Sequence, residues 1–443
     1  MKGSGRNTLV IGLVAVLTIC GEAKTQETPM KPRPNIIIIL ADDYGYGDVG
    51  CYGSERFQTP NLDALAAGGI RFTDFHSNAG TCSPTRAALM TGRYQQRCGI
   101  QGVITAAGHR HTGLDLTETT IAEVLKPAGY STAIFGKWHL GYKAEYSPIH
   151  QGFDEFVGFV SGNVDYHAHL DQTGVEDWWK QDQLLPEVGY TTDLITDHAV
   201  DFIQRNREQP FFLYIAHEAP HYPIQGRNDP PQYEPGKGRV KVESSFETYR
   251  EMIEVMDENI GRVKKAVDDA GLTKNTFIFF FSDNGPATHG SAGPLRGKKG
   301  QIWEGGHRVP AIAYWPGKIA AGQTSSETAM GADLLPTLAA MSGTPLPDGI
   351  QLDGVDLSSH LLTESSLASR NLYWSFGNQM AVRQKQFKLV TNRKFENPRL
   401  YNLAEDIGEK VNIADENPEL VKALLAALRE WHGEVNAGTK RRS

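Results

Sequence analysis

Cys82 opens the segment of this sequence whose residue types are best suited to chemistry. Residues 82–86 read Cys-Ser-Pro-Thr-Arg, and residues 89–92 read Leu-Met-Thr-Gly. Because proline is favoured in the first turn of a helix, we expect a helix to begin near Pro84. The Cys82 thiol would then lie at the positive end of that helix, where free N–H groups attract anions, and Arg86 one turn later could face the same anion. A single cysteine in such a place is more often a small buried residue than a reactive one.

Lys137 and His139 form a second candidate pair, at the end of a predicted strand over residues 131–135. Side chains two residues apart in a strand share one face, so an extended backbone would present both side chains to the same anion. A lysine and a histidine that end a strand are usually surface residues when nothing else accompanies them. Here other polar clusters follow other predicted strands.

Two pairs of oxygen-bearing side chains follow apolar segments. Asp42 and Asp43 end one such segment, and Asp283 and Asn284 end another. Carboxylate and amide oxygens are hard ligands that suit Ca²⁺ or Mg²⁺, and the pattern does not suit zinc. Taken alone, each pair is more often a turn or a helix cap.

Alternating helical and apolar segments must position these clusters. Residues 35–40 are a continuous, β-branched run, which is typical of a central strand covered on both faces. Predicted helices followed by predicted strands then recur at 117–125 with 131–135, 192–205 with 211–216, and 246–270 with 276–281. This order predicts an α/β fold with a mostly parallel sheet, whose ligand site lies beyond the carboxyl ends of the strands.

The C-terminal part has a different pattern. From about Asn371 the strands look short and antiparallel, at 372–376, 380–383 and 387–391, and a helix is predicted over 418–432. A small α+β subdomain packed on the main domain fits this order. We therefore expect a main domain over 24–365 and a subdomain over 366–443.

Composition narrows the class of protein. The chain has 443 residues, a formal net charge of -8, 40% hydrophobic and 22% charged residues, which are ordinary values for a globular protein. An acidic balance argues against nucleic acid as a partner, since phosphate backbones require clustered lysine and arginine. It does not exclude a small anionic substrate, because a local basic pocket can override the overall sign.

The N-terminus has the layout of a secretory signal peptide. Lys2 and Arg6 precede an apolar run over 9–20, and small residues at 21–23 offer cleavage after Ala23. The run is short for a membrane span, so we expect cleavage in preference to an anchor, and an exported, periplasmic or secreted chain with no stable membrane insertion. The sequence leaves open whether the remaining Cys51 and Cys98 pair or stay free.

The motifs around Cys82 and Lys137 together resemble the two signatures of the type I sulfatase family, within the alkaline phosphatase-like superfamily. The segments Ala219-Pro-His221-Tyr-Pro and Gly297-Lys-Lys299-Gly, and the later Leu400-Tyr-Asn-Leu, also resemble segments of that family. The resemblance covers nearly the whole mature chain. It implies an alkaline phosphatase-like sheet with a small C-terminal subdomain, and a glycan sulfatase of the bacterial kind.

In that family a formylglycine-generating enzyme or an anaerobic sulfatase-maturating enzyme oxidises the cysteine that matches Cys82. The resemblance implies that the resulting formylglycine, as a gem-diol, is the nucleophile, and that Ca²⁺ is held by the positions that match Asp42, Asp43, Cys82, Asp283 and Asn284. It also implies roles for the remaining positions. Arg86, Lys137 and Lys299 would stabilise charge, His221 would protonate the leaving alcohol, and His139 would take a proton when sulfate is released.

The alcohol part of the substrate is less well defined. The polar, aromatic stretch over 162–169 offers Asp165 and His167 as sugar contacts, and His307 and Arg308 are further candidates. Solvated loop residues explain the same pattern equally well. The segments around Asp165 and His221 resemble those of sulfatases that act on galactose or N-acetylgalactosamine glycans, which implies a sulfated carbohydrate substrate.

Two rival functions fit the same residues. A phosphatase or phosphonate monoester hydrolase of the same superfamily can share the Cys-x-Pro-x-Arg motif. A glycan-binding protein whose Cys82 is never converted would also keep most of the sequence. Relative rates on sulfate and phosphate esters separate the first rival, and the mass of the peptide that contains Cys82 separates the second.

Overall fold

The computed structural model describes residues 1–12, 33–240 and 244–437 and divides the chain into two units, Met1–Pro32 and Arg33–Ser443. In the first unit residues 1–12 form no helix or strand. Most of the predicted apolar run and the cleavage point after Ala23 lie outside the described residues, so the signal peptide stays a prediction. No helix in the described residues combines the length and apolar character that crossing a bilayer requires.

A ten-stranded mixed sheet forms the centre of the second unit, with parallel strands in its middle. Strand β1 (Asn35–Ala41) lies between β11 (Thr276–Ser282) and β8 (Phe211–Ala216), and all three are parallel. The parallel set continues through β4 (Ser131–Lys137) and β5 (Glu155–Phe159). The outer strands on the β11 side are β12 (Ala311–Tyr314), β2 (Ile70–Phe72) and β13 (Gln323–Ser325), and those on the β5 side are β6 (Trp179–Lys180) and β7 (Gln183–Leu184).

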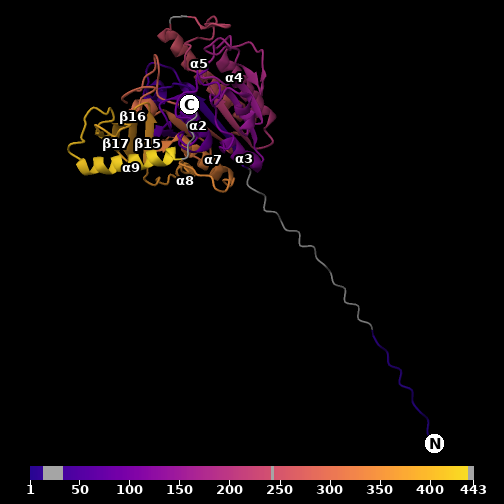
Figure 1. Ribbon diagram of the computed structural model, residues 1–443. Helices are drawn as coiled ribbons and strands as arrows, with labels where there is room; N and C mark the ends of the chain where they lie inside the picture. The colour runs from indigo at the N-terminus through magenta and orange to yellow at the C-terminus, as the bar shows by residue number, and fades with distance from the viewer. Residues whose placement is uncertain (13–32, 241–243, 438–443) are drawn as a thin grey trace. The chain divides into compact units, whose positions relative to one another are not determined.

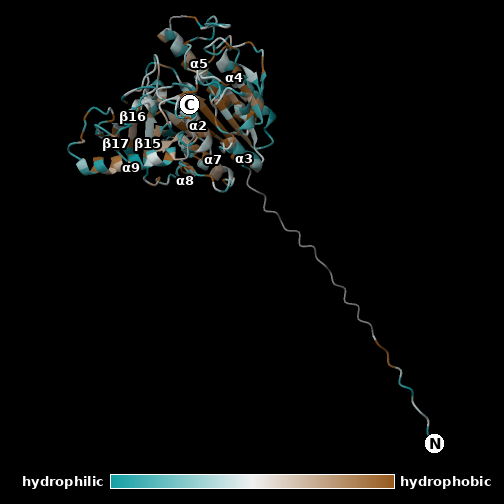
Figure 2. Cartoon of the chain, in the orientation of Figure 1, coloured by the Kyte–Doolittle hydropathy of each residue, from teal (hydrophilic) through white to brown (hydrophobic). Residues whose placement is uncertain are grey.

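Strand β1 shows why the sheet is buried on both faces. Ile36, Ile38 and Leu40 belong to one hydrophobic core, and the alternate residues, including Ile37 and Ile39, belong to another. Successive side chains of a strand point to opposite faces, so a run without polar residues needs a cover on each side. Helices α2 (Cys82–Thr91), α3 (Ile121–Leu125), α7 (Leu334–Ser342) and α8 (Ser358–Thr363) contribute to the first core, and α1 (Pro60–Ala67), α4 (Thr191–Arg205) and α5 (Phe246–Asp269) to the second. Figure 2 shows the most hydrophobic colour on these central strands.

One predicted helix start differs from the structure, and another agrees with it. Helix α3 begins at Ile121 and not at Thr117, because Thr120 caps it: the Thr120 hydroxyl accepts from the Glu123 N–H at 3.2 Å, and the Glu123 carboxylate accepts from the Thr120 N–H at 2.8 Å. Helix α2 begins at Cys82, two residues before Pro84.

A second, four-stranded antiparallel sheet forms the C-terminal part, as predicted. Its strands are β15 (Asn371–Phe376), β16 (Gln379–Gln384), β17 (Phe387–Asn392) and β18 (Arg399–Asn402). Helix α9 (Pro418–Asn436) lies along this sheet (Figure 1) and shares a core with it that includes Trp374, Leu389 and Leu428. The fold prediction, a mostly parallel sheet flanked by helices with a small antiparallel C-terminal sheet, is confirmed. The boundary between residues 365 and 366 remains a prediction.

Several short elements also belong to the second unit. They are β3 (Phe75–His76) with β14 (Ala329–Met330), β9 (Tyr233–Glu234) with β10 (Gly238–Arg239), and the one-turn helix α6 (Glu304–His307).

Candidate active site

The carboxyl ends of the parallel strands bring the predicted site residues together. Strands β1 and β11 pair in register through Ala41 and Ser282, so the acidic residues that follow each strand begin side by side. Lys137 is the last residue of β4, and Cys82 is the first residue of α2. The sheet order therefore explains why segments far apart in sequence share one site.

Three aspartates and three cations form a buried cluster at this edge. The Asp283 carboxylate accepts from the Arg86 guanidinium at 2.9 and 3.1 Å, and the Lys137 ammonium pairs with Asp42. Lys299 Nζ lies 2.6 Å from Asp43 Oδ1. The three carboxylates balance the three cations in formal charge. A divalent cation added here would therefore leave positive charge available for an anionic substrate.

Two carboxyl groups of this cluster have pKa values that are shifted in opposite directions. Burial, followed by the neighbouring charge of Asp42, raises the pKa of Asp283 to about 7. Burial also acts to raise the pKa of Asp42, but Lys137, His221 and Arg86 outweigh it and hold that pKa well below its usual range. A carboxyl group with a raised pKa beside ionised ones gains from a bound cation, because the cation offsets the repulsion among them.

The donor set fits a hard divalent cation. Ligand atoms of Asp42, Cys82 and Asp283 lie within 4.8 Å of one another. Asp42 Oδ1 and Asn284 Oδ1 are buried without a hydrogen-bond partner among the described residues. A buried polar atom left unpaired costs about 1–3 kcal/mol, so two such oxygens beside two further carboxylates indicate a site for an ion. Oxygen donors of this kind suit Ca²⁺ or Mg²⁺.

Cys82 is fully enclosed within this charged environment. Burial raises the pKa of its thiol, while the charges of Lys137 and Lys299 act in the opposite direction. The thiol therefore stays protonated as it stands and is a poor nucleophile, because the thiolate is the reactive form. It lines a pocket of about 200 Å³, together with Val103, Ile104, Thr105, His139, Gly162, Asn163, Gln172, His221, Tyr222 and Lys299.

The two histidines of the pocket have defined tautomers. His139 Nε2 lies 2.8 Å from the Ile104 carbonyl and must donate to it, which leaves the buried Nδ1 as an acceptor without a partner among the described residues. His221 Nδ1 donates to the Tyr222 carbonyl at 2.7 Å, and His221 Nε2 lies 3.7 Å from Asp43 Oδ2. Burial, with Lys299 next, lowers the pKa of His221 to about 4, and burial holds the pKa of His139 well below its usual range.

The expected strand geometry of Lys137 and His139 is wrong. Strand β4 ends at Lys137, and His139 follows it with φ of 58°, in the left-handed region. The two side chains therefore do not share a strand face. They still reach the same site, because the turn after β4 carries His139 to the pocket wall.

Comparison with known proteins decides the family. The sequence profile described as Sulfatase matches residues 34–344, and the profile described as N-sulphoglucosamine sulphohydrolase, C-terminal, matches residues 298–433. The chain belongs to the sulfatase family. It is 36% identical to human arylsulfatase A over 88% of this chain and 86% of that protein, and 36% identical to mouse N-acetylgalactosamine-6-sulfatase over 80% and 71%. It is a sulfuric ester hydrolase.

Solved structures agree with this assignment. The structure titled "Crystal structure of Ps i-CgsB in complex with k-i-k-neocarrahexaose" has a TM-score of 0.83 and 30% identity, covering 93% of this chain and 94% of that one. A phosphonate monoester hydrolase of Agrobacterium radiobacter, at 21% identity and a TM-score of 0.65, covers 91% of this chain and 96% of that one and shares the fold. The predicted alkaline phosphatase-like class agrees with both.

The sulfatase does not present Asp165 and His167 to the pocket. The Asp165 carboxylate is fully buried and accepts from the backbone N–H groups of His167, Ala168 and Tyr233 at 2.7–2.9 Å. His167 Nε2 lies 3.0 Å from the Gly226 carbonyl. These side chains hold the loop in place, and its neighbours Asn163 and Gln172 line the pocket instead.

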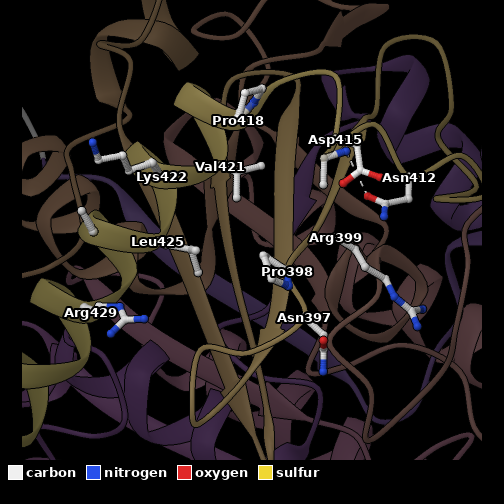
Figure 3. Close-up of a pocket in the computed structure, with 12 residues that line it drawn as sticks. Asn397, Pro398, Arg399, Asn412, Asp415, Pro418, Val421, Lys422, Leu425 and Arg429 are labelled. Carbon is white, nitrogen blue, oxygen red and sulfur yellow. Dashed lines mark hydrogen bonds between the residues drawn. The ribbon is translucent and has the colours of Figure 1, made fainter.

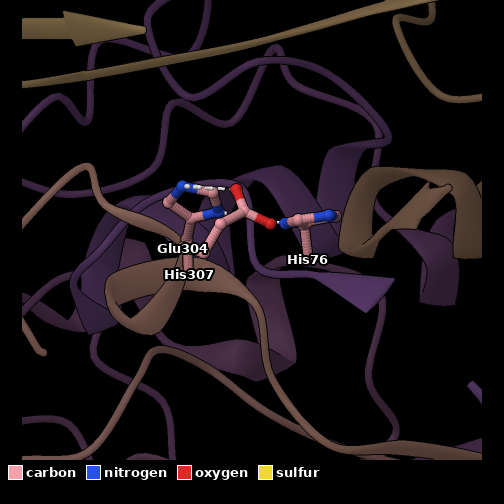
Figure 4. A group of neighbouring side chains, drawn as sticks. All are labelled: His76, Glu304 and His307. Atoms are coloured by element: carbon pink, nitrogen blue, oxygen red, sulfur yellow. Dashed lines mark hydrogen bonds and ion pairs between the residues drawn. The ribbon is translucent and has the colours of Figure 1, made fainter. Parts of the chain in front are cut away.

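His307 and Arg308 of the sulfatase lie in a separate buried ionic network. Arg308 pairs with Asp74 at 3.3 Å and with Glu304 at 3.2 Å, and His307 Nδ1 lies 3.0 Å from His76 Nδ1. Figure 4 shows His76, Glu304 and His307 close enough to suggest a metal site. Lysine and arginine side chains of the C-terminal sheet already supply the positive charge there: Lys388 lies 3.0 Å from Glu304, and Arg383 lies 3.1 Å from His76 Nε2. We therefore interpret this cluster as an internal ion network and leave both residues out of the proposed substrate site.

Some pocket residues could not be identified from the sequence. Val103, Ile104 and Thr105 carry no motif, and only their contact with the pocket marks them. Tyr222 lies inside the Ala-Pro-His-Tyr-Pro segment, so the same resemblance that indicated His221 could have indicated it. A larger hollow of about 870 Å³, between β18 and α9 (Figure 3), holds Arg399, Lys422 and Arg429 but no nucleophile and no pair of carboxylates. Of these two hollows, the small pocket at Cys82 combines a cysteine with histidine and lysine side chains.

Proposed function

We propose that this sulfatase removes sulfate esters from a carbohydrate of the galactose or N-acetylgalactosamine type, using formylglycine made from Cys82 and a bound Ca²⁺. The observation that carries the proposal is the convergence of Cys82 with three carboxylates and three cations at one sheet edge. The likeness to an N-acetylgalactosamine-6-sulfatase and to a protein solved with a neocarrahexaose supports the choice of sugar.

Asp42, Asp43, Asp283 and Asn284 would hold the cation, with the modified residue 82 beside them. When present, formylglycine supplies a hydroxyl nucleophile and the cation supplies positive charge to the sulfate oxygens. A dedicated maturating enzyme would act on Cys82 before folding is complete, because the thiol is buried in the folded chain. Export through the predicted signal peptide is part of the same proposal.

The chain's own cations orient and bind the sulfate group. Burial raises the pKa of the Cys82 thiol, and the positive charges of Lys137 and Lys299 act against this rise. Both lysines are therefore placed to attract an oxyanion at this position. Arg86 is fixed by Asp283 and by the Lys137 carbonyl at 2.9 Å, and it keeps the cluster positive. Preorganised charges in a buried site need no rearrangement as charge develops on the reacting group.

The two histidines would move protons at opposite ends of the reaction. His221 Nε2 faces the cluster, and an anionic ester bound next to it favours its protonated form, in which Nε2 donates to the departing alcohol oxygen. His139 Nδ1 lies on the pocket wall, has no hydrogen-bond partner within the described part of the chain, and can take a proton when sulfate is released.

Sulfate release from sulfated mono- and disaccharides by matured protein tests the proposal. Cys82→Ala should abolish turnover, whereas Cys98→Ala, at another buried free cysteine, should retain it. Matched aryl sulfate and aryl phosphate substrates address the phosphatase alternative, and a faster rate on phosphate would overturn the assignment of sulfate. An unmodified thiol at Cys82 in active protein from the native host would overturn the assignment of formylglycine.

A further inference from the structure

Arg239 is an exposed cation beside an aromatic residue of the proposed catalytic pocket. Its guanidinium lies 5.6 Å from the centre of the Tyr222 ring, in a cation–π contact. Its side chain is exposed, and it forms no ion pair with any carboxylate of the described residues. Tyr222 itself lines the pocket and stacks on His221, with ring centres 4.3 Å apart.

Strand β10 fixes Arg239 in this place from the other side as well. In the antiparallel pair of β10 and β9, Arg239 lies opposite Tyr233. The Tyr233 hydroxyl accepts a hydrogen bond from Asn163 Nδ2 at 2.6 Å. The charge of Arg239 also acts on the Tyr233 hydroxyl. Asn163 is a pocket residue, so both aromatic neighbours of Arg239 contact residues of the pocket wall.

Gly238 brings the β10 backbone close to the pocket loop. Its φ is 71°, and a Cβ at this position would lie 2.2 Å from the Gln172 carbonyl oxygen. Only glycine accepts both the conformation and the contact. Because Gln172 lines the pocket, the strand that carries Arg239 runs directly against the pocket rim.

We propose that Arg239 binds a second oxyanion of the substrate, a sulfate or a carboxylate on the sugar next to the one that is desulfated. This rests on the proposed function, and it narrows the substrate class to glycans with more than one anionic group. The pocket of about 200 Å³ is too small for a long oligosaccharide, so a neighbouring sugar must lie outside it, at the rim. An arginine in cation–π contact with an aromatic ring is suited to such a group, since its planar fork matches carboxylate and sulfate oxygens.

Three disaccharides with the same sulfated terminal sugar test the proposal. The neighbouring sugar is neutral in the first, sulfated in the second and a uronic acid in the third. Arg239→Gln should raise KM about three- to tenfold for the second or third disaccharide, the range expected for an exposed charge-assisted contact, with kcat unchanged. It should leave the neutral disaccharide unaffected. Arg239→Lys should retain part of the preference because it keeps the charge, and added salt should weaken it in the wild type.

Arg429→Gln is the matched control. Arg429 is also exposed, lies 4.4 Å from the Phe395 ring centre, and lines the distant hollow of Figure 3. This variant should leave KM and kcat unchanged for all three disaccharides. An equal effect of Arg239→Gln on all three disaccharides, or none on either dianionic one, would overturn the proposal.

A binding measurement separates this inference from the proposed function. Calorimetry on Cys82→Ala protein, with and without Arg239→Gln, gives the affinity for the disulfated and the singly sulfated disaccharide. Tighter binding of the disulfated form that depends on Arg239 supports the inference even if no sulfate is released. In the contrary outcome, the wild type releases sulfate while Cys82→Ala protein binds the disulfated disaccharide equally well with and without Arg239→Gln. That result would refute the inference and leave the proposed function standing.

Discussion

Lys388 offers a quantitative test of how the C-terminal sheet is attached to the catalytic part. Its ammonium group is fully buried and lies 3.0 Å from Glu304 Oε1 and 3.0 Å from Glu409 Oε1. The Glu304 contact is also a hydrogen bond, whereas the Glu409 contact is an ion pair without hydrogen-bond geometry. Lys388→Met removes the charge and keeps most of the volume, so it leaves two buried carboxylates with one cation fewer.

The expected loss follows from these distances. At an effective dielectric constant of about 20, a unit charge pair at this separation is worth about 5 kcal/mol. The variant no longer has to bury an ammonium group, which offsets part of this loss. Removing one partner of a buried ion pair generally costs about 3–5 kcal/mol, and we expect Lys388→Met to lower the free energy of unfolding by that amount at pH 8. Urea unfolding followed by tryptophan fluorescence measures it, and Lys410→Met, at an exposed lysine, is the control.

The pH dependence of this loss has a defined sign. Burial raises the pKa of Glu409 even with Lys388 present, and Lys388 acts against that rise. Without Lys388 the folded-state pKa rises further, so the penalty is absent below the ordinary glutamate pKa and complete above the raised one. The deficit of Lys388→Met should therefore be smaller at pH 5 than at pH 8. Glu409→Gln in the same chain should recover part of it, and a loss under about 1 kcal/mol at pH 8 without such recovery would refute the reasoning.

Three further outcomes follow from the site. His221→Ala should reduce the rate on a sugar sulfate by about 10²–10⁴ and affect nitrophenyl sulfate much less, because nitrophenolate leaves without a proton donor; equal losses in the two assays would contradict the acid role. Chelation with EGTA should abolish sulfate release and lower the melting temperature, and Ca²⁺ should restore both; an unchanged melting temperature would argue against a resident cation. Asn284→Ala should weaken the restoring effect of Ca²⁺, visible as a higher half-saturating concentration in the same thermal titration.

The elements that could be predicted are those whose pattern is local. The run of residues 36–40 has no polar member, and burial on both faces is the one environment that accepts it in a strand. Helices α4 and α5 agree with the spacing of their apolar residues to within one residue at each end. Once these elements alternate, the sheet rule places Asp42 and Asp283 at one edge without further information.

Residues whose side chains depend on distant partners could not be placed from sequence. Asp165 and His307 are polar residues in or beside glycine-containing loops, as a sugar contact would be. In the fold Asp165 is satisfied by backbone N–H groups, one of them 68 positions away at Tyr233, and His307 lies 3.2 Å from Lys388, 81 positions away. No local pattern distinguishes a polar group that faces substrate from one that is neutralised internally.

The partners of the charged groups therefore distinguish two kinds of buried ionic cluster in this sulfatase. Around Glu304 the cations of the C-terminal sheet lie on the carboxylates, and even Glu409 Oε1, which accepts no hydrogen bond among the described residues, has the Lys388 ammonium 3.0 Å away. Around Asp42 three cations balance three carboxylates, yet two buried oxygens have no hydrogen-bond partner in the part of the chain that the structure describes. In the first arrangement each carboxylate has a cation beside it, whereas in the second two oxygens are left for an ion. That unmet requirement, more than the number of charges, is the physical reason to place catalysis at Cys82.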